Sequence, residues 1–131
     1  MIYLDSSALL KLVREEHESA ALEHWLSARE EMPTVSSELA KIEVLRACRR
    51  LSAEALPKAR VLVASLDLIP ITSDLVEHAT EIGEPALRSL DAINLVSALS
   101  IREELSAFVV YDRRLYDAAA AQALEPLRPG A

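Results

Sequence analysis

Two aspartates each follow directly on a short apolar run, one near each end of the chain. Asp5 closes the stretch MIYLD, and Asp112 closes the stretch AFVVYD. If these two runs are neighbouring parallel strands, both carboxylates project into one crevice at the carboxyl edge of the sheet. Each aspartate also precedes an expected helix, so helix capping is the competing interpretation for each residue taken alone.

Two further acids lie on expected helices. In SSELAKIEVLRACRR, the neighbours of Glu43 three and four positions away include Leu39 and Ala47, so its charge lies on a largely apolar stripe and needs a partner. An ion pair with Arg46, which reaches solvent, is the alternative to a metal or catalytic role. Asp91 opens DAINLVSALS, where the helix dipole favours an acid and the aliphatic neighbours place the helix against a sheet.

Carboxylates brought together repel one another, and at neutral pH either some stay protonated or a cation neutralises them. Oxygen ligands without paired Cys or His favour Mg²⁺ or Mn²⁺ over zinc. The three histidines are scattered along the sequence and are expected on the surface (His17, His24 and His78). A divalent ion that activates water and stabilises charge on a phosphoryl oxygen indicates phosphodiester hydrolysis.

The composition excludes several other classes of site. Cys48 is the single cysteine and is expected to be a small buried residue in a helix. With only Gly83 and Gly130 as glycines, the chain has no glycine-rich loop of the kind that cradles phosphates or dinucleotides. The net charge of −7 gives no chain-wide attraction for nucleic acid, so an RNA substrate needs a local basic patch or metal ions.

Short apolar segments alternate with longer helical patterns along the 131 residues, which predicts one α/β domain with a parallel sheet covered on both faces. The sequence contains no repeat or linker. The expected strands are 2–4, 33–35, 66–71, 107–111 and 124–127. The expected helices run to about 14 and over 19–29, 38–51, 53–65, 74–82, 89–104 and 113–123. No apolar stretch is long enough to span a bilayer, and Asp5 and Lys11 interrupt the start of the chain, so we expect a cytoplasmic protein.

Four stretches carry a family resemblance. MIYLDSSALLKL, SSELAKIEVLRACRR, LRSLDAINLVSAL and FVVYDRRLYDAA, in this order and spacing, resemble the motifs of PIN-domain ribonucleases, in particular the VapC-type toxins of toxin–antitoxin pairs. The closing LEPLRPG is also typical of that group. The resemblance implies a single PIN domain over 1–131, with a PIN-like α/β/α sandwich and a short parallel sheet of four to five strands.

The same resemblance implies a Mg²⁺- or Mn²⁺-dependent endoribonuclease. Its catalytic and metal-binding acids would be Asp5, Glu43, Asp91 and Asp112. Ser6 would supply a supporting hydroxyl. Asn94, which stands where relatives often carry histidine, would be a second supporting residue. Arg46 and Arg113 adjoin two of the acids and are expected to contact RNA. A homodimer and a cognate antitoxin that inserts a segment into the active-site groove are also implied.

Two other functions are consistent with the residues. One is a binding module without catalysis, whose acids are helix caps and whose net charge of −7 suits a basic partner segment. The other is an aspartyl-phosphate phosphotransferase with Asp5 as nucleophile. That chemistry is disfavoured because Ser7 stands where a second aspartate is needed.

Overall fold

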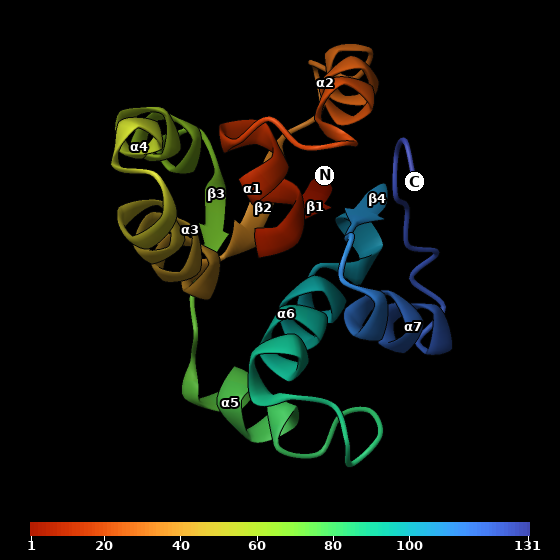
Figure 1. The fold of residues 1–131 in the computed structure, drawn as a ribbon. Helices are drawn as coiled ribbons and strands as arrows, with labels where there is room; N and C mark the ends of the chain where they lie inside the picture. The colour runs from red at the N-terminus through yellow and green to blue at the C-terminus, as the bar shows by residue number, and fades with distance from the viewer.

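The computed structural model describes residues 1–131 and contains one four-stranded sheet (Figure 1). The strands are β1 (Ile2–Leu4), β2 (Thr34–Ser37), β3 (Asp67–Ile69) and β4 (Ala107–Val109). Their order across the sheet is β3-β2-β1-β4, and every pairing is parallel. The chain moves outward from β1 to β3 and then returns to place β4 on the other side of β1. The strand order therefore reverses between β1 and β4.

Helices cover both faces of the sheet, as the α/β prediction requires. The elements before β3 include α1 (Ser6–Val13), α2 (Ser19–Ser27), α3 (Glu38–Leu51) and α4 (Leu56–Ala64). The elements after β3 include α5 (Ser73–Ala79), α6 (Ser89–Ser100) and α7 (Arg113–Ala121). Figure 1 shows these two groups on opposite sides of the strands. Two short 3-10 turns, Ala53–Ala55 and Arg102–Glu104, complete the secondary structure.

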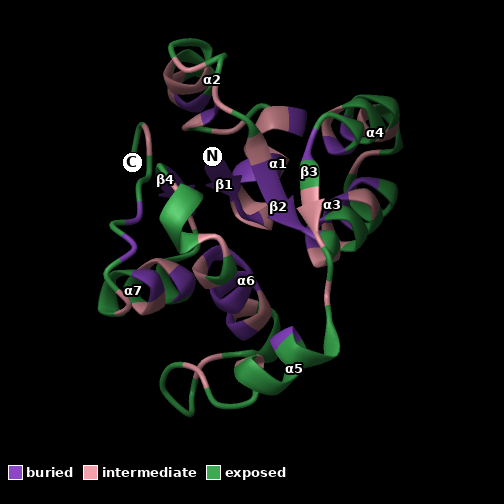
Figure 2. Cartoon of the chain, turned by 180° about the vertical axis from the view of Figure 1, so that it is seen from behind, coloured by how far each residue is buried: buried purple, intermediate pink, exposed green.

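The side chains of β1 alternate between two cores. Ile2 and Leu4 pack with α1, α3 and α4, whereas Tyr3 packs with Phe108 of β4 and with α6 and α7. The rings of Tyr3 and Phe108 lie 5.1 Å apart between centroids. Both faces of β1 are buried, so all three of its residues are apolar. This uninterrupted apolar run is why the strand could be predicted from the sequence. Figure 2 shows β1, β2 and much of α6 buried, β3 half-buried to exposed, and α5 largely exposed.

The predicted fifth strand, 124–127, is wrong. The segment makes only an isolated parallel bridge between Leu127 and Val109. Ala123 and Glu125 adopt positive φ angles of 60° and 51°, a left-handed conformation that cannot belong to an extended strand.

Two predicted helices also differ from the structure. The helix expected over 89–104 ends at Ser100 and is followed by the 3-10 turn Arg102–Glu104. The helix expected over 53–65 divides into the turn Ala53–Ala55 and α4, in which Pro57 occupies the first turn. No helix combines the length and the apolar character needed to cross a membrane.

Candidate active site

Asp5 and Asp112 lie at the same edge of the sheet because β1 and β4 are neighbours. Leu4 is paired with Val109, and the backbone N–H of Asp5 donates to the carbonyl of Val109 at 3.2 Å. This edge is the carboxyl edge, at the point where the strand order reverses, which is where open α/β sheets bind ligands.

Both aspartates are also helix caps, so the two interpretations of these residues are compatible. Asp5 Oδ1 accepts from the N–H of Ala8 at 3.0 Å, and Asp112 Oδ1 accepts from the N–H of Leu115 at 3.0 Å. In each case capping engages one carboxylate oxygen. The side-chain hydrogen bonds of both residues all involve Oδ1, so Oδ2 is left without a partner within the chain.

Ser7 joins the two strand ends and was not singled out as a site residue by sequence reasoning. Its hydroxyl donates to Asp5 Oδ1 at 2.6 Å. The Ser7 Oγ also accepts from the backbone N–H groups of Tyr111 at 2.9 Å and Asp112 at 3.3 Å. The serine thus holds Asp5 against the segment that carries Asp112. Its position two residues after Asp5, in the first turn of α1, was the only available signal.

Glu43 reaches the site from α3. Ser37, the last residue of β2, caps this helix by accepting from the N–H of Leu39 at 3.1 Å, which fixes where the helix begins. Glu43 is half-buried, and its Oε1 accepts from the hydroxyl of Ser6 at 2.6 Å. Arg46 is exposed and forms no ion pair with Glu43, so the ion-pair interpretation is wrong. The predicted supporting residue Ser6 holds Glu43, whereas Ser7 holds Asp5.

Asp91 lies in the first turn of α6 but does not cap it. The N-cap residue is Arg88, which makes no capping hydrogen bond through its side chain. Asp91 instead faces an open cavity of about 460 Å³. The cavity is lined by Glu43, Arg88, Ser89, Leu90, Asp91, Asp112, Arg113 and Arg114.

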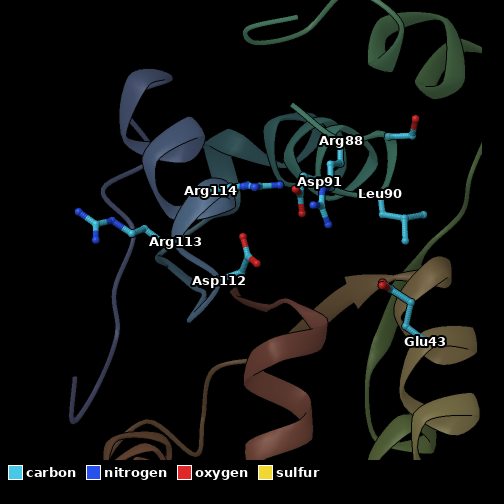
Figure 3. Close-up of a pocket in the computed structure, with 8 residues that line it drawn as sticks. Glu43, Arg88, Leu90, Asp91, Asp112, Arg113 and Arg114 are labelled. Atoms are coloured by element: carbon cyan, nitrogen blue, oxygen red, sulfur yellow. The ribbon is translucent and has the colours of Figure 1, made fainter. Parts of the chain in front are cut away.

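Figure 3 shows how the charged side chains lie around this cavity, which we call the acidic cavity. Arg88 and Arg114 approach Asp91, and Arg113 points away from the acids. Asp5 is only 4 % exposed and is not among the lining residues. Of the two arginines predicted to contact RNA, Arg113 lies at the rim and Arg46 outside the cavity. Arg88 belongs to an irregular segment and was missed by sequence reasoning.

The carboxyl groups perturb one another. Burial raises the pKa of Asp5 to about 7, against an ordinary value of 3.8, and the charge of Asp112 adds to the rise. Burial also raises the pKa of Glu43, with a further contribution from Asp91. The pKa of Asp91 is raised by burial and by Asp112, while Arg88 and Arg114 oppose that rise. The charges of all four acids are therefore close enough to interact across one site.

The donor chemistry of this site fits a hard divalent cation. All four side chains offer oxygen, and a cation would relieve the repulsion that raises their pKa values. No three His, Cys, Asp or Glu side chains converge around one point in this structure. The four carboxylates must therefore move closer together to bind one ion. The three histidines are exposed, as expected, and none lines the acidic cavity.

Asn94 lies apart from these acids. Its Oδ1 accepts from the hydroxyl of Tyr3 at 2.7 Å, and its Nδ2 donates to the carbonyl of Leu90 at 3.1 Å. The residue is 4 % exposed and does not line the acidic cavity. These contacts make Asn94 a link between β1 and the first turns of α6.

Comparisons with known proteins agree with this geometry. Residues 2–121 match the model of the PIN domain family. The chain is 44% identical to Ribonuclease VapC35 of Mycobacterium tuberculosis, covering 99% of this chain and 98% of that protein. It is 39% identical to Ribonuclease VapC47 of the same species, over 100% of this chain and 98% of the relative.

A solved structure supports the fold independently. The crystal structure of Mycobacterium tuberculosis VapC20, described as a Sarcin-Ricin loop cleaving toxin, superposes with a TM-score of 0.75. The alignment covers 98% of this chain and 100% of that one, at 16% identity. The chain belongs to the PIN-domain family and, within it, to the VapC ribonucleases.

Proposed function

We propose that this protein is a Mg²⁺- or Mn²⁺-dependent endoribonuclease and the toxin of a VapBC-type pair, with Asp5, Glu43, Asp91 and Asp112 as its catalytic and metal-binding acids. One observation carries the proposal. Acids from four distant parts of the sequence gather at the carboxyl edge of the sheet, and three of them have a raised pKa. The full-length similarity to proteins named ribonucleases supports the same activity.

The chain's own residues prepare the site for a phosphodiester. Arg88 and Arg114 line the acidic cavity and supply positive charge for the phosphate, in a protein whose net charge is −7. Ser7 and Ser6 orient Asp5 and Glu43 through hydrogen bonds of 2.6 Å each. Carboxylates with a raised pKa are stronger bases, so the acids can accept the proton that an attacking water loses.

The four acids would hold the divalent ion through their oxygens. When bound, such an ion supplies Lewis-acid polarisation of the phosphoryl oxygen and lowers the pKa of water. The chain contributes the placement of the acids, the arginine charges and the hydrogen bonds of the two serines.

The partners of this protein belong to the same proposal. RNA is the substrate, a cognate antitoxin inserts a segment into the acidic cavity, and the chain pairs with a second copy of itself in the cytoplasm. Large apolar side chains left uncovered on the surface support association. Ile42 of α3 is 55% exposed and Val76 of α5 is 47% exposed.

RNA cleavage tests the function directly. The purified protein is incubated with total cellular RNA and Mn²⁺, and new 5′ ends are mapped. We expect discrete cleavage that chelation stops and that Asp5→Asn abolishes in a folded protein. Asp67→Asn on β3, at the opposite edge of the sheet, removes the same charge and should leave cleavage intact. Full cleavage by Asp5→Asn refutes the proposed site.

Calorimetry with Mn²⁺ separates the proposal from a non-catalytic module. A heat of binding that is lost in Asp5→Asn supports the metal centre. No heat together with no cleavage of any RNA favours the binding module without catalysis.

A further inference from the structure

A second open cavity adjoins the acidic cavity and has a different chemical character. It has a volume of about 660 Å³ and lies between α7 and the segment that follows α5. Its lining includes Glu84, Leu87, Arg114, Asp117, Ala118 and Ala121. We call it the side cavity. Arg114 lines both cavities, so the two spaces meet at this one side chain.

The charges decide which part of a nucleotide each cavity can hold. The acidic cavity is lined by Arg88, Arg113 and Arg114 as well as by three acids, so it suits a phosphate once a divalent cation offsets those acids. In the side cavity Arg114 is the only cation and lies at the shared wall, while Glu84 and Asp117 are acids without an ion pair. Two carboxylates repel a phosphate but accept hydrogen bonds from the edge of a base. The charges of the side cavity therefore suit a base better than a phosphate of the RNA backbone.

The apolar residues of the side cavity provide a surface for the face of that base. Leu87, Ala118 and Ala121 contribute small or aliphatic groups, and Ala118 and Ala121 follow Arg114 at helical spacing on one side of α7. Gly83, with φ of +72°, turns the chain at the other wall and lies close to Leu87. An added Cβ at Gly83 would come within 2.9 Å of Leu87 Cδ2, so the turn at Gly83 packs closely against the Leu87 side chain that lines the cavity.

We propose that the side cavity is a base-recognition subsite that takes a guanine of single-stranded RNA next to the cleaved phosphodiester, with Asp117 reading its Watson–Crick edge. This inference rests on the proposed nuclease function. Guanine is the base with two adjacent donors, N1–H and the N2 amino group, which one carboxylate accepts together. Adenine, cytosine and uracil each present a single donor group on that edge, so they satisfy the carboxylate less well. Proteins that recognise single-stranded RNA commonly form hydrogen bonds to the Watson–Crick edges of unstacked bases.

Binding measured without cleavage tests the subsite. Fluorescence anisotropy is recorded with the catalytically inactive Asp5→Asn protein and two labelled RNAs, an oligouridine and the same strand with one central guanine. We expect the guanine-containing strand to bind about tenfold more tightly, as a good bidentate contact to a base produces. Adding Asp117→Asn should remove that preference, because the amide offers a donor where a second acceptor is needed.

A matched variant and a cleavage assay complete the design. Asp67→Asn, added to Asp5→Asn, changes the net charge equally on the opposite edge of the sheet and should retain the guanine preference. In the wild-type background, Asp117→Asn should lose the guanine enrichment at one position beside the cut in a randomised RNA pool. Equal binding of both RNAs by Asp5→Asn overturns the subsite, even if the wild-type protein cleaves RNA. The wild-type protein could instead fail to cleave RNA while the guanine preference is present and is removed by Asp117→Asn. That outcome counts against the proposed nuclease function and supports the subsite.

Discussion

The Ser7 hydroxyl donates to Asp5 at 2.6 Å while it accepts the backbone N–H of Tyr111, a residue 104 positions away in the chain. One side chain thus fixes the most buried acid of the site and attaches β1 to the segment after β4. Asp5 is therefore positioned by this hydrogen bond as well as by the strand that precedes it.

Ser7→Ala should impair both stability and cleavage. It removes a hydroxyl that satisfies Asp5 and two backbone N–H groups, so we expect the free energy of unfolding to fall by about 1–3 kcal/mol. The rate constant for RNA cleavage should fall at least tenfold, because Asp5 loses its orientation. Urea denaturation and single-turnover cleavage measure the two effects. Ser100→Ala, whose hydroxyl bonds only within its own turn, is the control and should change neither.

The stability of the metal-free protein should fall as the pH rises from about 4 to 7. The pKa of Asp5 is about 7 in the folded chain, against an ordinary value of 3.8, so between these values the unfolded chain has released a proton that the folded chain keeps. The loss attributable to Asp5 is at most about 4 kcal/mol. Urea denaturation in the presence of a chelator measures it. Asp5→Asn should flatten this dependence, and a slope as steep as that of the wild type would contradict the assignment.

Arg88→Ala should weaken RNA binding with little effect on folding. Arg88 is exposed and lines the acidic cavity. Its loss should make the slope of the logarithm of the binding constant against the logarithm of the salt concentration shallower by about 0.7, which is the value for one phosphate contact to single-stranded nucleic acid. Arg60→Ala, an exposed residue of α4, is the matched control. The same titration on Arg46→Ala and Arg113→Ala tests the two arginines that the sequence predicts as RNA contacts. An unchanged slope for Arg88→Ala would show that Arg88 does not contact the RNA.

Asn94→Ala should lower stability without changing the cleavage rate at temperatures well below the unfolding transition. It leaves the buried hydroxyl of Tyr3 without its partner, which costs about 1–3 kcal/mol. The double variant Tyr3→Phe with Asn94→Leu removes both polar groups and should recover part of that loss, as a double-mutant cycle reveals. A cleavage rate that falls in Asn94→Ala at full folding would instead support a role for Asn94 toward the substrate.

Much of this architecture could be predicted because buried parallel strands are short apolar runs that end at recognisable polar residues. This applies to β1 and β4, and to the acids Asp5 and Asp112 that follow them. Glu43 could be identified because a charge on an apolar helix stripe needs an explanation. The four stretches of family resemblance then predicted the fold and the family together, and both are confirmed.

The remaining features depend on tertiary geometry. The role of Ser7 requires the register that pairs Leu4 with Val109, which no local pattern encodes. Arg88 is the N-cap of α6 and precedes its first regular turn, so the helical pattern did not identify it as a lining residue of the acidic cavity. The expected strand at 124–127 failed because positive φ angles at Ala123 and Glu125 are rare for such residues and have no sequence signal.

The return of β4 to the side of β1 has a consequence for synthesis on the ribosome. Asp112 and the N–H groups that hold Ser7 come from the last fifth of the chain, so three of the four acids are translated before the fourth can join them. A nascent or prematurely terminated polypeptide that ends before Tyr111 therefore lacks Asp112 and both N–H groups that donate to Ser7.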